Sequence, residues 1–249
     1  MEERITSRKN PLLVRVKKLL SSRREREAAG LFVSDGTKLL SEAVRWYPGL
    51  DTVILSEVIQ VQLPEHVRVI RVPEDVMASI SPMESPQGAV FLCRMPEKTP
   101  FVPKPGMLLL DGIQDPGNLG TILRTADALD TELALLEGCA DPYSHKVVRS
   151  SMGAVFRRPV VQTTWACARE AFQSAGIPIA VTALSDRASD LRQAPLGQMA
   201  VVIGSEGQGV RQEILRSSDA ELIIPMNPRC ESLNAAIASA IVMWQMKQK

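Results

Sequence analysis

The sequence predicts an α/β protein: a mostly parallel sheet with helices on both faces, preceded by a small α/β domain. Short apolar runs alternate with helical stretches in the second part of the chain, which is typical of a parallel sheet. A proline-rich stretch separates that part from a helix-rich beginning. The 249 residues, 45% of them hydrophobic and 23% charged, are enough to bury a core in each of two domains.

The small α/β domain is expected to comprise residues 1–96. Helices are predicted where apolar residues recur at helical spacing or a glycine ends the pattern, in PLLVRVKKLL, SSRREREAAG and GTKLLSEAVRW. Strands are predicted in short apolar runs, TVILS, VRVIRV and AVFLCR. Residues 97–105 are expected to be an extended linker, because the stretch from Arg94 to Gly106 holds four of the seventeen prolines.

The larger domain is expected to comprise residues 106–249. Buried strands are predicted in MLLLDG, ELALLEG, PVVQT, PIAVTAL, MAVVIG and ELIIPM. Helices are predicted between several of them, in LGTILRTADAL, SHKVVRSSMGAVF and WACAREAFQSAG. Ligands of open parallel sheets bind beyond the carboxyl ends of the strands, so the loops at those ends form the candidate site. Three of these loops are rich in glycine or proline: DGIQDPGNLG, IGSEGQGV and IPMNPRCESLN.

The first loop leads into a helix on which one arginine stands apart from the apolar residues. Asn118 fits the N-cap role, since its side chain can accept from a free backbone N–H. Arg124 lies opposite the expected apolar stripe and projects outward near the loop; the stripe comprises Leu119, Ile122, Leu123 and Ala126. Considered alone, this loop is better explained as a capped helix with an exposed arginine than as a functional site.

The second and third loops combine close backbone approach with polar side chains. Glycines in GSEGQG let the backbone approach a ligand, and Glu206 among them suits a cationic ligand or an arginine better than a phosphate. In the third loop, Ser232 is expected to be the N-cap and Asn234 to lie in the first helical turn. Alanines follow and permit close packing on this helix. A tight turn and a capped helix would explain each loop by itself.

Together the three loops resemble those of the SpoU (TrmH-type) family of S-adenosylmethionine (SAM)-dependent RNA ribose 2′-O-methyltransferases, part of the SPOUT class. The residues that carry the resemblance are Asn118 and Arg124 in DPGNLGTILR, Glu206 in IGSEGQG, and Ser232 with Asn234 in IPMNPRCESLN. The segments KVVRSSMGA, ITSRKNPLLVRVKKLL and GLFVSDGTKLL also resemble the family, so that nearly the whole chain is covered. Two departures are Asp35, where glutamate is more common, and Cys230, where a small apolar residue is common.

The resemblance implies a carboxyl-terminal trefoil knot that builds a SAM pocket and a homodimer interface. It also implies that SAM contacts Gly204, Ile224 and Leu233, with Thr182 and Leu184 as further candidates. The implied catalytic residues are Arg124, Asn118, Glu206, Ser232 and Asn234. Arginine is the family's suggested general base, but a guanidinium is effectively always protonated. We therefore expect Arg124 to stabilise the developing alkoxide or bind a phosphate, with Asn118 and Glu206 orienting it and Ser232 and Asn234 positioning the ribose.

The expected function is methylation of a ribose 2′-hydroxyl in RNA, and ribosomal RNA is the first choice because a separate amino-terminal domain suggests a structured substrate. Transfer RNA remains an alternative. A catalytically silent RNA-binding protein would be indicated by loss of Arg124, Asn118 or the Glu206 loop, and all three are present. Base methylation through a cysteine nucleophile has one candidate, Cys230, which lacks an evident basic partner in the sequence.

Charge and cysteine spacing set the remaining expectations. Residues 1–30 contain nine Lys or Arg against four Glu, a basic segment that could bind a polyanion or simply be a solvated helix face. Neither the four widely spaced cysteines nor the two distant histidines suggest a metal site. With no apparent signal peptide or membrane-spanning run, the sequence is expected to be a soluble, cytoplasmic protein.

Overall fold

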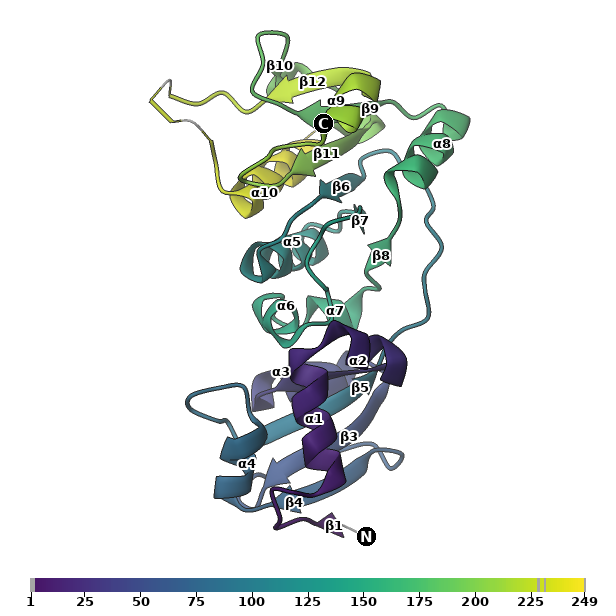
Figure 1. Ribbon diagram of the computed structural model, residues 1–249. Helices are drawn as coiled ribbons and strands as arrows, with labels where there is room; N and C mark the ends of the chain where they lie inside the picture. The colour runs from purple at the N-terminus through teal and green to yellow at the C-terminus, as the bar shows by residue number, and fades with distance from the viewer. Residues whose placement is uncertain (1–2, 228, 231, 249) are drawn as a thin grey trace. The chain divides into compact units, whose positions relative to one another are not determined.

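The computed structural model describes residues 3–227, 229–230 and 232–248, and the chain divides into two compact units (Figure 1). The first unit comprises Met1–Glu97 with Asp141–Arg157, and the second comprises Lys98–Ala140 with Arg158–Lys249. Each unit has its own sheet and its own core. Residues 97–105, the expected linker, contain no helix or strand.

The first unit is built on a mixed five-stranded sheet. In spatial order its strands are β1 (Glu3–Arg4), β4 (Arg68–Val72), β3 (Leu50–Ser56), β5 (Ala89–Arg94) and β2 (Leu31–Asp35). Strands β1, β4 and β3 are parallel, whereas β5 runs antiparallel to both β3 and β2. The strands predicted in TVILS, VRVIRV and AVFLCR are confirmed, and β1 and β2 were not expected.

Helices cover both faces of this sheet: α1 (Pro11–Ser21), α2 (Arg23–Ala29), α3 (Thr37–Trp46), α4 (Glu74–Ile80), α6 (His145–Ser150) and α7 (Ala154–Arg157). Helix α1 begins at Pro11 because the side chain of Asn10 accepts a 2.9 Å hydrogen bond from the N–H of Leu12. Buried side chains of α1 and α4 pack with alternate strand residues such as Ile54 and Ile70. Helix α3 adds buried leucines at Leu39 and Leu40 to the core.

Residues 141–157 belong to the first unit, although the sequence-based boundaries assigned them to the second. Asp141 forms a buried ion pair with Arg26 of α2, at 2.5 Å from Nη2 and 2.9 Å from Nε. The ring centroid of Phe156 in α7 lies 6.3 Å from that of Phe32 and 6.1 Å from that of Phe91. The single helix expected in SHKVVRSSMGAVF is also wrong: Met152 and Gly153 adopt positive φ and divide it into α6 and α7.

The second unit is built on a seven-stranded sheet in which every described pairing is parallel. This confirms the predicted parallel α/β architecture. In spatial order the strands are β10 (Ser189–Asp190), β12 (Ala220–Ile223), β9 (Ile179–Thr182), β11 (Ala200–Gly204), β6 (Leu108–Asp111), β7 (Leu133–Leu135) and β8 (Val161–Gln162).

Helices lie on both faces of this sheet as well: α5 (Pro116–Ala128), α8 (Trp165–Ala175), α9 (Gln212–Ser217) and α10 (Ala235–Met246), with short 3₁₀ turns at Leu191–Gln193 and Leu196–Gln198. Trp165, Phe172 and Ile214 of α8 and α9 pack on one face with Leu109 and Val202. Helices α5 and α10 lie together on the other face (Figure 1).

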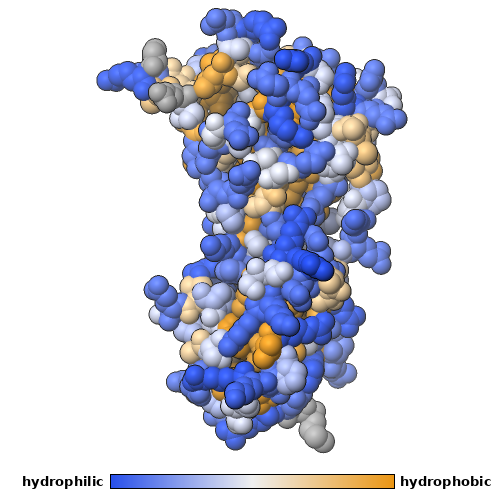
Figure 2. Space-filling model, in the orientation of Figure 1, coloured by the Kyte–Doolittle hydropathy of each residue, from blue (hydrophilic) through white to orange (hydrophobic). Residues whose placement is uncertain are grey.

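The visible surface is mostly hydrophilic, with apolar side chains in small groups (Figure 2). No helix within the described part of the chain is long and apolar enough to cross a membrane. The implied trefoil knot involves residues 224–234, of which 228 and 231 lie outside the described residues, and it stays a prediction.

Candidate active site and cofactor cavity

The three loops singled out in the sequence all begin at one edge of the parallel sheet. Strands β6, β11 and β12 end at Asp111, Gly204 and Ile223, and parallel strands present their carboxyl ends on the same side. Gly204 pairs with Asp111 in register, so the first and second loops leave the sheet side by side. The edge expected to carry the site therefore carries all three loops.

One side chain from each loop meets in a hydrogen-bonded cluster, here called the amide–carboxylate cluster: Asn118, Glu206 and Asn234. Oε1 of Glu206 accepts from Nδ2 of Asn118 and from Nδ2 of Asn234, both at 2.7 Å. Nδ2 of Asn234 also donates to Oδ1 of Asn118 at 3.0 Å, and the backbone N–H of Ala235 donates to Oε1 of Glu206 at 3.1 Å. The carboxylate thus lies at the amino terminus of α10, where the helix dipole favours negative charge.

Asn234, and not Ser232, is the N-cap of α10. Its Oδ1 accepts from the N–H groups of Ala236 at 2.9 Å and Ile237 at 3.2 Å. The expected positions are wrong because the helix begins at Ala235, two residues later than the sequence suggested. Both hydrogens and both lone pairs of the Asn234 amide are consequently in use.

Asn118 is likewise not a cap. Helix α5 begins at Pro116, whose fixed φ suits the first helical position, and Asp115 accepts from the N–H of Asn118 at 2.7 Å. The side chain of Asn118 is therefore free to reach Glu206. The apolar stripe of α5 is buried as predicted, at Leu119, Ile122, Leu123 and Ala126.

Arg124 is exposed on α5, on the side opposite that stripe, as the helical spacing predicted. Within the described residues its guanidinium has no hydrogen-bond or ion-pair partner, and it does not line the cavity described below. The structure therefore brings together Asn118, Glu206 and Asn234, and leaves Arg124 outside their hydrogen bonds.

A cavity of about 750 Å³ opens beside the cluster, within the size range of small-molecule sites. All five residues expected to contact a cofactor line it: Thr182, Leu184, Gly204, Ile224 and Leu233. Glu206 and Ser232 line it as well. The cavity therefore combines an apolar wall with polar side chains from the second and third loops.

Gly204 is required by the fold of its own loop. A Cβ at this position would lie 2.1 Å from the carbonyl carbon of Gly209 and 2.2 Å from the N of Val210, closer than any side chain permits. The N–H of Gly209 donates to the carbonyl of Ser205 at 2.9 Å and closes the loop on itself. The glycine thus lets the second loop fold tightly at the cavity wall.

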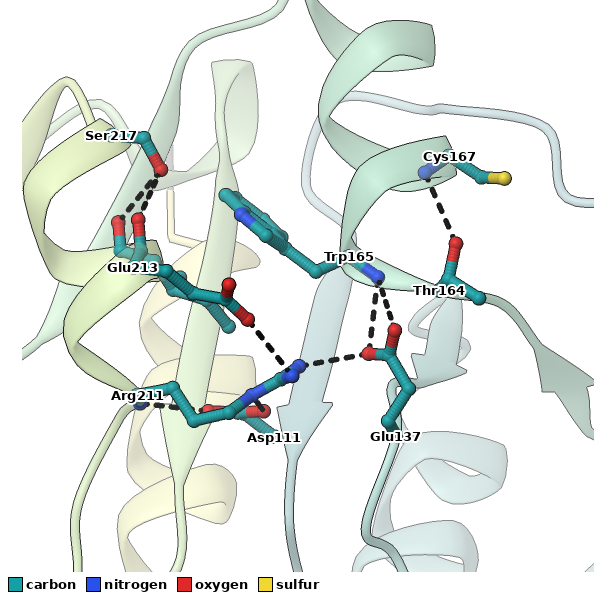
Figure 3. A network of polar contacts seen from close by, with 9 residues as sticks. Asp111, Glu137, Thr164, Trp165, Cys167, Arg211, Glu213 and Ser217 are labelled. Carbon is teal, nitrogen blue, oxygen red and sulfur yellow. Dashed lines mark hydrogen bonds and ion pairs between the residues drawn. The ribbon is translucent and has the colours of Figure 1, made fainter.

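A second polar cluster at the same edge was not expected from the sequence. The guanidinium of Arg211 binds Oδ1 of Asp111 at 2.6 Å, Oε2 of Glu137 at 2.8 Å and Oε1 of Glu213 at 3.0 Å (Figure 3). These four residues are here called the Arg211 cluster. An acid that ends an all-apolar strand such as LLLD needs a cationic partner when buried, and this signal could have pointed to it.

Contacts within the Arg211 cluster shift the pKa of Glu137. Burial disfavours the charged form of Glu137, but hydrogen bonds from backbone N–H groups and from Arg211 outweigh it and lower the pKa of this carboxyl. The N–H of Trp165 donates to both of its oxygens at 3.1 Å (Figure 3). The Glu137 carboxylate therefore stays ionised at neutral pH and also binds the start of α8.

In the described ranges, no three His, Cys, Asp or Glu side chains are placed to hold a metal ion. Burial raises the pKa of the Cys139 thiol to about 11, so this thiol is protonated at neutral pH. Cys230, the candidate nucleophile beside the third loop, is exposed.

Comparison with protein families gives two matches. The model described as the SpoU rRNA Methylase family matches residues 105–244, more than half of the chain. The model described as the MRM3-like substrate binding domain matches residues 10–90.

Individual relatives span nearly the whole chain. The chain is 32% identical to the 23S rRNA (guanosine(2553)-2′-O)-methyltransferase RlmP of Bacillus subtilis, over 98% of this chain and 99% of that protein. An AdoMet-bound rRNA methyltransferase from Sinorhizobium meliloti is 27% identical with a TM-score of 0.86, covering 99% of this chain and 97% of that one. The SpoU methyltransferase AviRb from Streptomyces viridochromogenes, in complex with AdoMet, is 27% identical with a TM-score of 0.83, covering 96% and 97%.

Proposed function

The chain belongs to the SpoU rRNA methylase family, and on that premise we propose that this SAM-dependent RNA 2′-O-methyltransferase acts on ribosomal RNA. The observation that carries the proposal is the full-length similarity to RlmP, which acts on a guanosine of 23S rRNA. The match of residues 10–90 to a substrate-binding domain supports an RNA large enough to engage both units.

SAM fits the cavity beside the second and third loops. Its apolar lining at Leu184, Ile224 and Leu233 suits an adenosine, and Gly204, which also lines it, lets the second loop fold tightly at the cavity wall. We assign these residues and Thr182 to cofactor binding. When bound, SAM supplies an electrophilic methyl group on a sulfonium, a good leaving group that needs no further activation.

The chain's own residues have to activate the ribose hydroxyl, which is a weak acid and a poor nucleophile. Arg124 is proposed to stabilise the developing alkoxide or to hold the neighbouring phosphate with its permanently charged guanidinium. Its exposure and lack of a partner within the described structure leave all its N–H groups available to RNA.

The amide–carboxylate cluster is proposed to position the nucleotide. The amide of Asn234 is fully used in capping α10 and in binding Glu206 and Asn118, so this residue acts by fixing the other two. Asn118 has one amide hydrogen without a partner among residues that the structure describes, and Ser232 lines the cavity. These two groups are the ones left to contact the ribose.

A homodimer is proposed through α10. Ile237, Ile241 and Trp244 recur at helical spacing and are 52%, 36% and 61% exposed, while the opposite side of α10 is buried. A helix that is apolar on all sides is usually covered on all sides. A second copy of the chain, as the family resemblance implies, is the proposed cover.

The basic side chains of residues 1–30 are proposed to bind the RNA backbone. Four of the nine Lys and Arg residues in this segment form ion pairs with Asp or Glu: Arg4, Arg8, Arg23 and Arg26. Arg15, Lys17, Lys18 and Arg24 of α1 and α2 are exposed and, among the side chains described, have no acidic partner. Free cations of this kind are what phosphate contacts require.

The cytoplasm is the proposed compartment, since all four cysteines are free thiols, as suits a reducing environment. The target is tested by incubating the protein with labelled SAM and separated ribosomal and transfer RNAs, followed by digestion to nucleosides. A 2′-O-methylated nucleoside from ribosomal RNA is expected. Label in transfer RNA alone would overturn the proposed target, and no label in any RNA would indicate a silent RNA-binding protein.

A further inference from the structure

Arg211 binds a buried carboxylate with two different groups. Its Nε lies 2.6 Å from Oδ1 of Asp111, and its backbone N–H donates to Oδ2 of the same side chain at 2.9 Å. The side chain of Asp111 is only 1% exposed, so its charge depends on these contacts. Both oxygens of one buried acid are thus occupied by a single residue.

The ion pair between Asp111 and Arg211 connects the start of the first loop to the end of the second loop. Asp111 ends β6 and begins the loop that leads to Asn118, whereas Arg211 ends the loop that carries Glu206. Strand pairing joins Gly204 to Asp111, and the ion pair joins Arg211 to the same Asp111. The loop bearing Glu206 is therefore fixed at both of its ends to one residue of β6.

In the part of the chain that the structure describes, the Arg211 cluster forms no direct bond with the residues of the amide–carboxylate cluster. Asp111 shares the side of its strand with Leu109, which packs toward α8 and α9, whereas α5 and α10 lie on the other face. No described atom of Arg211 bonds to Asn118, Glu206 or Asn234. Any effect on Glu206 has to pass through the backbone of residues 205–210.

We propose that Arg211 is a positioning residue for methyl transfer. By fixing the end of the second loop, it keeps Glu206 hydrogen-bonded to Asn118 and Asn234 and keeps residues 205–210 as one wall of the cofactor cavity. Glu137 and Glu213 orient the guanidinium from the solvent side. This inference rests on the proposed role of Glu206 in the reaction.

The test uses the full chain and begins with substitutions at Arg211 and Asp111. Arg211→Gln alone leaves the Asp111 carboxylate buried without its cation and can unfold the protein. The pair Asp111→Asn with Arg211→Gln removes both charges and is the variant that keeps the test informative. Arg211→Lys retains the charge but not the planar fork, so it is expected to rescue only part of the effect.

Binding of SAM, measured by calorimetry, needs no RNA. The paired variant is expected to bind SAM about tenfold more weakly or worse, since its cavity wall is no longer fixed. Arg158→Gln is the matched control, because Arg158 also combines an ion pair, to Asp130 at 3.0 Å, with further hydrogen bonds, but lies before β8 at the amino-terminal edge of the sheet. Its affinity for SAM should equal that of the unsubstituted chain.

Single-turnover rates at saturating SAM test the route through Glu206. We expect the paired variant to lose about 10²-fold in rate, and to lose little further when Glu206→Gln is added, because both changes remove the same contact. If Arg211 had a merely structural role, the rate losses of the paired variant and of Glu206→Gln would multiply when the changes are combined. Multiplying losses, or unchanged SAM affinity and rate in the folded paired variant, would overturn the proposal. If the unsubstituted chain methylates no RNA, the proposed function fails, and the SAM titration still decides on Arg211.

Discussion

Oε1 of Glu206 lies 2.7 Å from Nδ2 of Asn118, although 88 residues separate the two in the sequence. The same oxygen lies 2.7 Å from Nδ2 of Asn234 and 3.1 Å from the N–H of Ala235. Three donors on one oxygen require the full charge of a carboxylate, because charge-assisted hydrogen bonds are about twice as strong as neutral ones.

Replacing Glu206 by Gln is therefore expected to loosen the cluster. A neutral amide oxygen holds three donors poorly, so turnover should fall roughly 10²–10³-fold, as for the loss of a group that acts on a developing charge. Unfolding in urea should show a loss of about 1–2 kcal/mol at most, because the site is exposed. Glu170→Gln, an exposed acid on α8, is the control. A Glu206→Gln protein with normal turnover would remove Glu206 from the proposed mechanism.

Arg124→Ala is expected to lower turnover while leaving the stability of the protein almost unchanged. Because the side chain is exposed and opposite the buried stripe, the free energy of unfolding should change by less than about 0.5 kcal/mol. Turnover should drop by roughly 10²–10³ or more, while SAM affinity measured by calorimetry stays the same. Arg124→Lys should rescue poorly, since an ammonium cannot reproduce the guanidinium fork. Turnover at the original rate would leave Arg124 an ordinary surface residue.

Gly204→Ala should disrupt the second loop from within. A Cβ at Gly204 would collide with the backbone of Gly209 and Val210. We expect calorimetry to show a loss of SAM binding together with a lower melting temperature. Gly197→Ala is the control, because a Cβ built there would meet its nearest atom, the carbonyl oxygen of Met246, at an ordinary 3.4 Å, and Gly197 does not line the cavity. Equal SAM binding by both variants would contradict this interpretation.

The site illustrates what sequence patterns reveal. Apolar runs identified the strands that end at Asp111 and Gly204, and helical spacing placed Arg124 correctly, because both depend on local periodicity. Both caps were misassigned: Asp115 and not Asn118 caps α5, and Asn234 and not Ser232 caps α10. Asn118 instead reaches Glu206, a partner far away in the chain that local spacing does not reveal. The same reason hid the pairing of Arg211 with Asp111.

Trp244→Glu tests the proposed dimer. A charge in the exposed stripe of α10 should prevent burial against a second copy, so sedimentation should shift from dimer to monomer at micromolar concentration. Trp46→Glu, which changes a tryptophan that is 48% exposed in the first unit, should leave the sedimentation unchanged. A monomeric unsubstituted chain would refute the dimer itself.

Substitution of the free cations tests RNA binding without removing a whole unit. The triple variant Lys17→Gln, Lys18→Gln and Arg24→Gln should weaken binding to ribosomal RNA. It should also flatten the dependence of log K on log salt, by roughly 0.7–0.9 for each phosphate that the protein no longer neutralises. The control replaces Arg4, Arg8 and Arg68 by Gln, since acids already engage these three. An identical salt slope for both triples would place the RNA elsewhere.

The pairing of Arg26 with Asp141 has a consequence for synthesis of the chain. The first unit needs residues 141–157, so a ribosome must complete β6, α5 and β7 before that unit can close its core. An early fragment ending near residue 97 would expose Phe32 and Phe91, which Phe156 covers in the finished protein. Translation of the first 97 residues alone should therefore yield a protease-sensitive nascent chain, and resistance should appear only after residue 157 has left the exit tunnel.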